Sequence, residues 1–260
     1  MIKLVVVDLD NTLLRSDKTL SDYTNKVFLE IRKKGVQFVL NTARNDVISI
    51  PILKKINASG LICCNGAVLY FNDKQIARYT MDTLSVAWLF VEIGKIAPGR
   101  NWSVTYADST YSNYNDPNFV QVNSSDALPM GDVRMIIVRN VSVEEYQALH
   151  RVIRDKFNAI QVEKGNVIVT DLKACKDKAV NYIMNYCGIP ADEVVAFGDD
   201  VNDIAFMRRA GISVAVENAK DAVKLIADDK CPSNDCDGVA KWLARYFQID
   251  IPTEKNDDRL

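Results

Sequence analysis

Histidine is almost absent from this chain: His150 is the only one among 260 residues, which excludes a zinc site built from several histidines. The six cysteines do not compensate, because no Cys-x-x-Cys pair occurs; Cys63 and Cys64 are adjacent, and Cys231 and Cys236 lie five positions apart. We therefore expect buried or incidental thiols, and we expect His150 to lie exposed on a helix. Long apolar runs are also missing, since none reaches the roughly 18 residues that a membrane-spanning helix requires.

The chain has no excess of charge of one sign, with 32 Lys and Arg against 34 Asp and Glu and a formal net charge of −2. No long basic stripe is present to neutralise a nucleic-acid backbone, so nucleic acid is not expected as a partner. The first ten residues, MIKLVVVDLD, carry two acids and too short an apolar stretch for a secretory signal. We expect a cytoplasmic protein, monomeric or weakly dimeric, that does not bind membranes.

Strand and helix patterns alternate at both ends of the chain and predict a doubly wound parallel β-sheet. Between residues 81 and 172 the order changes to helix, strands, helix, strands, which predicts an inserted α+β domain. We assign residues 1–80 and 173–260 to the α/β core, and we expect the polar tail from Asp250 onward to be frayed. The patterns also predict helices at 21–34, 51–56 and 143–157 and β-hairpins turning at Asn72-Asp73 and Lys164-Gly165.

Two acids, Asp8 and Asp10, close the first apolar strand, which spans residues 2–7. In extended backbone, residues two apart point to the same face, so both carboxylates are expected to project from the carboxyl end of a central strand. In open α/β sheets this is the edge where ligands bind. A polar strand end that only caps a turn is the structural alternative. A calcium loop of the EF-hand type is excluded, because Leu13 and Thr19 stand where such a loop needs Gly and Glu.

A second acidic group, Gly198-Asp199-Asp200-Val201-Asn202-Asp203, follows the apolar strand at 194–197. Helix capping alone would explain Asp203, but it would not explain Asp199. If both strands are central, four acids share one edge, and two carboxylates about 4 Å apart repel each other by roughly 4 kcal/mol at an effective dielectric near 20. An intervening proton or cation relieves this repulsion. If a cation is bound, oxygen-only ligands and the lack of histidine favour Mg²⁺.

Two further residues can complete a site at this edge. Thr42 follows the strand that ends at Leu40 and offers a hydroxyl group, although it could simply cap a helix. Lys176 begins the helix that precedes the strand at 194–197, and it would offset the charge of the acids and of a bound phosphate. A solvated surface charge is the alternative for each lysine here, and we prefer it for Lys178.

In this order along the chain, the motifs resemble the four motifs of the haloacid dehalogenase superfamily, most closely its Cof-like phosphatase branch. Further segments also look similar to that branch: Asn65-Gly66-Ala67, Asn218-Ala219 and the late run from Ser233 to Ala240. Two positions depart from the family pattern, because Asn11 and Ala43 stand where glycine is usual. The choice of Lys176 over Lys178 follows the family spacing to Gly188.

The resemblance implies a Rossmann-like core and a covalent phosphoryl-transfer mechanism that uses Mg²⁺. Asp8 would be the nucleophile that forms an aspartyl-phosphate, and Asp10 would be the general acid and base. The implied metal ligands are Asp8, the backbone carbonyl of Asp10, Asp199 and Asp203. Thr42 and Lys176 would hold phosphoryl oxygens, and the implied substrate-binding residues are Arg44, Asn65, Gly66 and Asn202.

The place of the insertion adds to this interpretation. Only about 34 positions separate Asp8 from Thr42, which leaves no room for a cap, so the extra domain lies between Thr42 and Lys176. This resembles the type IIB cap of Cof-like phosphatases, and it implies hydrolysis of small phosphorylated metabolites, with sugar phosphates as the commonest class. Four cap aromatics could contact substrate, although packing within the cap is the preferred interpretation: Trp102, Tyr106, Tyr111 and Tyr114.

Three other functions stay open at this point. A phosphomutase shares the acids and a similar cap but returns the phosphoryl group to the sugar. A non-catalytic protein could keep the fold and bind phosphorylated ligands or a protein partner, although it would not need to keep three acids that repel one another together with a lysine: Asp8, Asp10, Asp199 and Lys176. A phosphoacceptor signalling domain uses similar residues but has about half this length.

Overall fold

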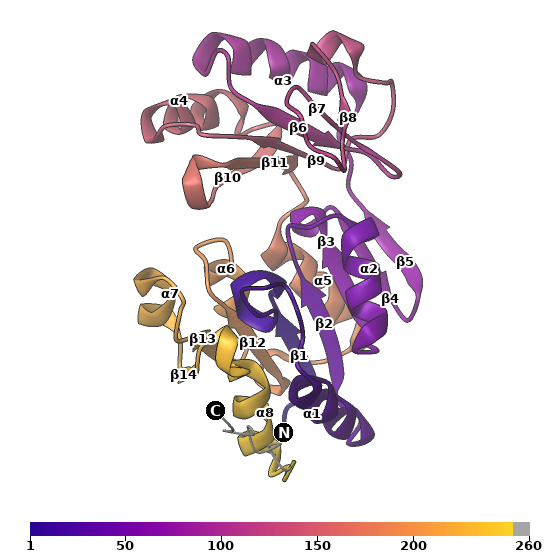
Figure 1. Cartoon of the computed structure of the whole chain (residues 1–260), viewed down its shortest axis with the longest axis vertical. Coiled ribbons are helices and arrows are strands. Elements are labelled where there is room, and N and C mark those ends of the chain that lie inside the picture. The colour runs from indigo at the N-terminus through magenta and orange to yellow at the C-terminus, as the bar shows by residue number, and fades with distance from the viewer. Residues whose placement is uncertain (252–260) are drawn as a thin grey trace, which may run out of the picture.

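The computed structural model describes residues 1–251, so most of the tail that was expected to fray lies outside the described residues. Two β-sheets form two layers of the molecule, one above the other (Figure 1). The lower sheet belongs to the part that contains both ends of the described chain, and the upper sheet belongs to the middle segment.

The lower sheet has eight strands in the order β14-β13-β12-β1-β2-β3-β4-β5. All neighbouring pairs from β14 to β3 are parallel, whereas β3, β4 and β5 pair antiparallel. The predicted doubly wound parallel sheet is therefore confirmed, and the predicted hairpin extends one edge of it. The strands are β1 (Leu4–Val7), β2 (Gln37–Asn41), β3 (Gly60–Cys63), β4 (Val68–Phe71), β5 (Lys74–Arg78), β12 (Val194–Gly198), β13 (Ile212–Val216) and β14 (Asp229–Cys231).

Strand β1 is central, because Val7 pairs with Phe197 of β12 on one side and with Leu40 of β2 on the other. All four of its residues are buried, as expected for a strand covered on both faces. The carboxyl ends of these three strands consequently meet at one edge, the edge that faces the upper sheet (Figure 1).

Helices cover this sheet, and capping residues explain where two of them begin. Ser21 accepts a hydrogen bond from the Thr24 amide and starts the first helix as predicted. The predicted start of the second helix at Pro51 is wrong, because the Asn45 side chain caps it at Ile48 N, more than one turn earlier. The helices are α1 (Asp22–Lys33), α2 (Asp46–Lys55), α5 (Lys176–Cys187), α6 (Ile204–Met207), α7 (Asp221–Ile226) and α8 (Gly238–Phe247).

The upper sheet has six strands in the order β10-β11-β9-β6-β7-β8. Two helices lie on the face that points away from the lower sheet, α3 (Thr83–Ile96) and α4 (Val143–Ile153) (Figure 1). The α+β character of the insertion is confirmed, while its exact junctions at 80/81 and 172/173 stay predictions. The strands are β6 (Trp102–Thr105), β7 (Thr110–Ser112), β8 (Val120–Gln121), β9 (Met135–Val138), β10 (Phe157–Gln161) and β11 (Val167–Asp171).

Two details of the insertion differ from the predictions. Helix α4 ends at Ile153 instead of 157, because Phe157 already belongs to β10, where it pairs with Asp171 of β11. His150 is half-buried with its ring 5.7 Å from that of Tyr146, so the predicted exposure is wrong. The hairpin through Lys164-Gly165 is present and joins β10 to β11.

Candidate functional site

The chain leaves β1 in a tight turn that carries the first two acids. After Val7, the amide of Asp8 still bonds to Phe197 O at 3.1 Å, but residues Leu9–Leu13 form a single π-helical turn in which Asn11 has a φ of +57°. The expectation that Asp8 and Asp10 project together from an extended strand is therefore wrong. Both still line one cavity, and they contact different partners within it.

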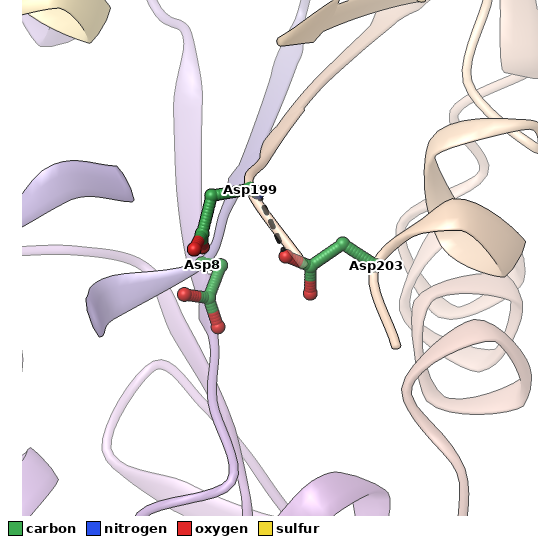
Figure 2. Close-up of side chains that lie close together, drawn as sticks. All are labelled: Asp8, Asp199 and Asp203. Atoms are coloured by element: carbon green, nitrogen blue, oxygen red, sulfur yellow. Dashed lines mark hydrogen bonds between the residues drawn. The ribbon is translucent and has the colours of Figure 1, made fainter. Parts of the chain in front are cut away.

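Three buried carboxylates meet at this edge: Asp8 after β1, Asp199 after β12, and Asp203 before α6 (Figure 2). One oxygen of each lies within 4.8 Å of the others. The Asp203 carboxylate accepts hydrogen bonds from the amides of Asp199 and Asp200, at 3.0 and 3.1 Å, and makes no capping bond to its own helix. Capping of α6 therefore does not explain why an acid stands at position 203. The Asp203 side chain instead holds the loop that carries Asp199.

Gly198 allows this close approach. A Cβ atom at this position would lie 2.5 Å from Cβ of Asp203, a contact too short for any side chain. The glycine at the end of β12 is thus required for the loop to fold back on itself with Asp203 beneath it.

One cation lies among the three acids. Lys176, the first residue of α5, donates to Asp8 Oδ1 at 2.5 Å and to Asp203 Oδ1 at 2.7 Å, and its side chain is buried. By contrast, Lys178 is exposed and donates to the backbone oxygen of Leu172. The spacing that favoured Lys176 agrees with where the structure places the two lysines.

Burial and mutual repulsion shift the acid–base equilibria of this cluster. Burial raises the pKa of Asp8 well above its usual range, and Lys176 opposes this effect. Burial, together with the neighbouring charge of Asp203, raises the pKa of Asp199 to about 7. Burial lowers the pKa of Lys176, but the charges of Asp203 and Asp8 outweigh this effect and hold it above its usual value. Three carboxylates facing one ammonium group leave an excess of negative charge.

The cluster suits a divalent cation. Its donors are carboxylate oxygens on three separate chain segments, and hard cations such as Mg²⁺ prefer oxygen ligands. Burial and the neighbouring carboxylates raise the pKa values of Asp8 and Asp199, and a cation bound between them would stabilise their ionised forms. The side chain of Asp10 is not part of this cluster.

The Asp10 carboxylate instead pairs with two basic side chains, those of Arg44 and Lys18. Arg44 donates two hydrogen bonds to its carboxylate, at 2.7 and 2.6 Å, and Lys18 lies 2.8 Å from Oδ1. Burial favours a higher pKa for Asp10, but the hydrogen bonds from Arg44 and Lys18 outweigh it and hold the pKa below its ordinary value. Lys18 was not predicted, because a lysine in a polar turn has no distinguishing pattern in the sequence.

The remaining predicted residues divide into lining and supporting groups. Thr42 and Asn202 line the cavity; the Thr42 hydroxyl accepts from Arg44 N instead of capping α2, and the buried Oδ1 of Asn202 has no partner among the described residues. Asn65 and Gly66 lie beneath the site. The backbone N–H of Asn65 donates to Thr42 O at 3.1 Å. Gly66 has a φ of +99°, and a Cβ at this position would clash with the backbone of Cys175.

The cavity above the acids has a volume of about 270 Å³, and the insertion supplies part of its lining. The hairpin between β10 and β11 contributes five lining residues: Val162, Glu163, Lys164, Asn166 and Ile168. None of the four cap aromatics is among the residues that line this cavity. Trp102 packs against Phe90 at 4.8 Å, and Tyr106 packs against Tyr111 at 5.5 Å, so these three pack within the cap. The sequence predicted this hairpin but held no signal that it faces the acids.

A sequence model of the haloacid dehalogenase-like hydrolases matches residues 5–243. The chain belongs to this family. It is 27% identical over 264 residues to the 5-amino-6-(5-phospho-D-ribitylamino)uracil phosphatase YitU of Bacillus subtilis, with 95% of this chain and 98% of YitU covered. It is 24% identical to the pyridoxal phosphate phosphatase YbhA of Escherichia coli, with 94% of this chain and 98% of YbhA covered.

Solved structures confirm the fold of this family member. A haloacid dehalogenase-like hydrolase from Bacteroides thetaiotaomicron superposes with a TM-score of 0.83 at 21% identity, covering 95% of this chain and 100% of the other. The subclass IIB sugar phosphatase BT4131 superposes with a TM-score of 0.81 at 22% identity, with the same coverage. The predicted family and the predicted class of enzyme, a phosphoric monoester hydrolase, are confirmed. Among residues 1–251, no helix combines the length and the apolarity needed to cross a bilayer.

Proposed function

We propose that this protein is a Mg²⁺-dependent phosphatase that hydrolyses small phosphorylated metabolites through an aspartyl-phosphate on Asp8. One observation carries the proposal: the Asp8 carboxylate lies 2.5 Å from the buried ammonium of Lys176, beside Asp199 and Asp203, at the base of a 270 Å³ cavity. A nucleophile, a phosphate-binding cation and a place for a metal thus share one small volume.

The residues divide the reaction into two steps. Asp8 attacks phosphorus, and the leaving oxygen takes a proton from Asp10 as the phosphoryl group moves to the carboxylate. Asp10, now ionised, then removes a proton from the water that attacks the aspartyl-phosphate and regenerates Asp8. Arg44 and Lys18 favour the ionised form of Asp10, which suits the second step and opposes the first, for which Asp10 must carry a proton.

Other residues hold the reactants in place. Thr42 and Lys176 are placed to bind phosphoryl oxygens, and Asn202 is placed to orient substrate. Asp8, Asp199, Asp203 and the backbone carbonyl of Asp10 would hold Mg²⁺, which supplies positive charge between Asp8 and the anionic phosphate.

A cavity of this size admits one small phosphorylated molecule, and sugar phosphates are the class we propose. The relatives named above act on a phosphoribitylamino-uracil, on pyridoxal phosphate and on a sugar phosphate. We further propose that the enzyme acts in the cytoplasm as a monomer or weak homodimer. Phosphate release from a panel of phosphorylated metabolites, with and without Mg²⁺, tests the proposal; failure to release phosphate from any of them would contradict it.

We expect the cap residue Lys164 to contribute to substrate binding. Lys164 lines the cavity and has no hydrogen-bond or ion-pair partner among the described residues, so its ammonium group is available to a ligand. Replacing Lys164 with methionine should raise KM for the best substrate about threefold to tenfold, as expected for loss of a hydrogen bond from a charged group that is partly solvated. The matched control is Lys55→Met at the exposed end of α2, and an unchanged KM in the Lys164 variant would exclude this role.

Stabilisation of the protein by Mg²⁺ should depend on pH. The pKa of Asp199 in the folded protein, about 7, exceeds its ordinary value of 3.8, so between these values the folded state binds the proton more tightly than the unfolded state. Stability from this site is therefore present at low pH and falls as pH rises toward 7, while the carboxylate becomes free to bind a cation. The rise in melting temperature caused by MgCl₂ should be small at pH 5.5 and larger at pH 8, measured against NaCl of equal ionic strength. An equal rise at both pH values would contradict the raised pKa of Asp199, and no rise at pH 8 would contradict the metal site.

A further inference from the structure

Two late segments of the chain have no part in the chemistry described above. Asn218 follows β13, and the segment from Ser233 to Asp237 precedes α8, yet both contact the turn that follows Asp8. We call residues 8–16 the catalytic loop, and we call the four side chains that contact it from these segments the C-terminal clamp: Asn218, Asn234, Asp235 and Asp237.

Two asparagines of the C-terminal clamp hold backbone carbonyls of the catalytic loop. Asn218 Nδ2 donates to Asn11 O at 2.7 Å, and its Oδ1 accepts from Asn234 N at 3.0 Å. Asn234 is buried, and its Nδ2 donates to Leu14 O at 2.9 Å. The Asn218 side chain therefore links the backbone of Asn234 to the catalytic loop, and the Asn234 side chain bonds to the same loop.

Two acids of the clamp hold the far end of the loop. Asp235 accepts from both the amide and the hydroxyl of Ser16, each at 2.7 Å. Asp237 accepts from Arg15 Nη2 at 2.7 Å and from Thr24 Oγ1 at 3.2 Å. These bonds tie the loop to the turn before α8, a helix that packs against α1.

The turn that carries the clamp has a specific shape. Asp237 has a φ of +56°, and a Cβ atom at position 238 would lie 1.8 Å from Pro232 O, so only glycine fits there. The tightness of the turn aims Asn234 inward and Asp235 and Asp237 toward the loop.

The catalytic loop needs such external support. Its internal backbone bonds are those of a π-turn, from Leu13 N to Asp8 O and from Leu14 N to Leu9 O. Asn11 adopts the left-handed conformation, which asparagine tolerates better than most residues other than glycine when nearby hydrogen bonds support it. Asn218 supplies a bond at that residue, directly after Asp10.

We propose that Asn218 and Asn234 are positioning residues, which hold the catalytic loop so that the Asp10 carboxylate faces the leaving group. They act through the loop, because neither lines the cavity. The inference rests on the proposed function, specifically on the role of Asp10 as general acid.

The first test uses two phosphate esters that differ in how much the leaving group needs a proton. Hydrolysis of an alkyl phosphate depends on the general acid, because the alkoxide leaving group needs a proton. Hydrolysis of p-nitrophenyl phosphate does not, because p-nitrophenolate can leave without a proton. Asn218→Ala should lower kcat on the best alkyl phosphate about fivefold to tenfold, with KM changed less than about threefold and kcat on p-nitrophenyl phosphate changed less than about threefold. Asn234→Ala should lower kcat on the alkyl phosphate further, but Asn234 is buried, so the exposed Asn218 provides the decisive variant.

Asn113→Ala is the matched control. Asn113 makes the same pair of bonds in the cap, donating to Arg100 O and accepting from Trp102 N, away from the site. Asn113→Ala should leave kcat on both phosphate esters unchanged. Equal losses on both esters in Asn218→Ala, or no loss on either, would overturn the proposal.

The second test does not depend on activity. Hydrogen exchange at the amides of Leu13 and Leu14 should be faster in Asn218→Ala than in the wild type, because the π-turn loses an external bond. Unchanged exchange would overturn the proposal even if activity falls. If the wild type hydrolyses neither ester, the proposed function fails, and the exchange experiment alone decides whether the clamp holds the loop.

Discussion

Replacing Asp8 with asparagine should lower phosphate-ester hydrolysis by more than about 1,000-fold, because an amide of the same shape cannot attack phosphorus. The same substitution should leave the metal-free protein at least as stable as the wild type. Burial and the neighbouring charges of Asp203 and Asp199 raise the pKa of Asp8, so the ionised form is disfavoured in the fold, and a neutral amide relieves that repulsion.

The measurements for Asp8→Asn are phosphate release on the best substrate and chemical unfolding in excess chelator. Asp155→Asn, an exposed cap position, is the control for loss of one carboxylate and should change neither quantity. A residual rate above about one per cent of wild type would exclude Asp8 as the nucleophile. A clear loss of metal-free stability would instead contradict the account of charge repulsion.

Replacing Lys176 with methionine should destabilise the metal-free protein by about 3–5 kcal/mol, because it leaves buried carboxylates without their cation. Both bonds of the ammonium group, to Asp8 and to Asp203, are lost together. Phosphatase activity should fall by more than about 100-fold as well, since one group that stabilises phosphoryl charge is removed. The two variants therefore have opposite effects on stability and the same effect on activity.

Lys178→Met provides the control on the same helix. Lys178 is exposed and bonds to a backbone oxygen, so its loss should change the free energy of unfolding by less than about 0.5 kcal/mol. The measurement is urea unfolding, in excess chelator, of the wild type, Lys176→Met and Lys178→Met. Equal effects at positions 176 and 178 would show that Lys176 does not balance the charge of a buried acidic cluster.

Local pattern in the sequence sufficed for the parts of the site that stand at strand ends. β1 and β12 are uninterrupted apolar strands, and parallel neighbours end at the same edge, so Asp8 and Asp199 could be placed together before any contact was known. Local pattern placed a lysine at the start of the helix on this edge, but the choice of Lys176 over Lys178 came from the family spacing to Gly188. The resemblance to the family also implied the roles that are proposed for these residues.

Orientation could not be predicted in the same way. The extended-strand rule failed for Asp8 and Asp10 because the chain turns at Leu9, and a π-turn with a left-handed Asn11 has no periodic signal. The bonds of Arg44 and Lys18 to Asp10 likewise join separate segments through long side chains, whose directions depend on the packing around them.

The sequence by itself determined the class of fold, the order of the acidic motifs and the family, because each depends on residues close together in the chain. Tertiary structure alone decided which cap residues close the cavity and which distant side chains hold the catalytic loop. The contact of Asn218 with Asn11 spans 207 positions, and the hairpin at Lys164 lines the same cavity as Asp8 only because the two sheets face each other. Such contacts arise when whole elements pack, and no local preference of either residue encodes them.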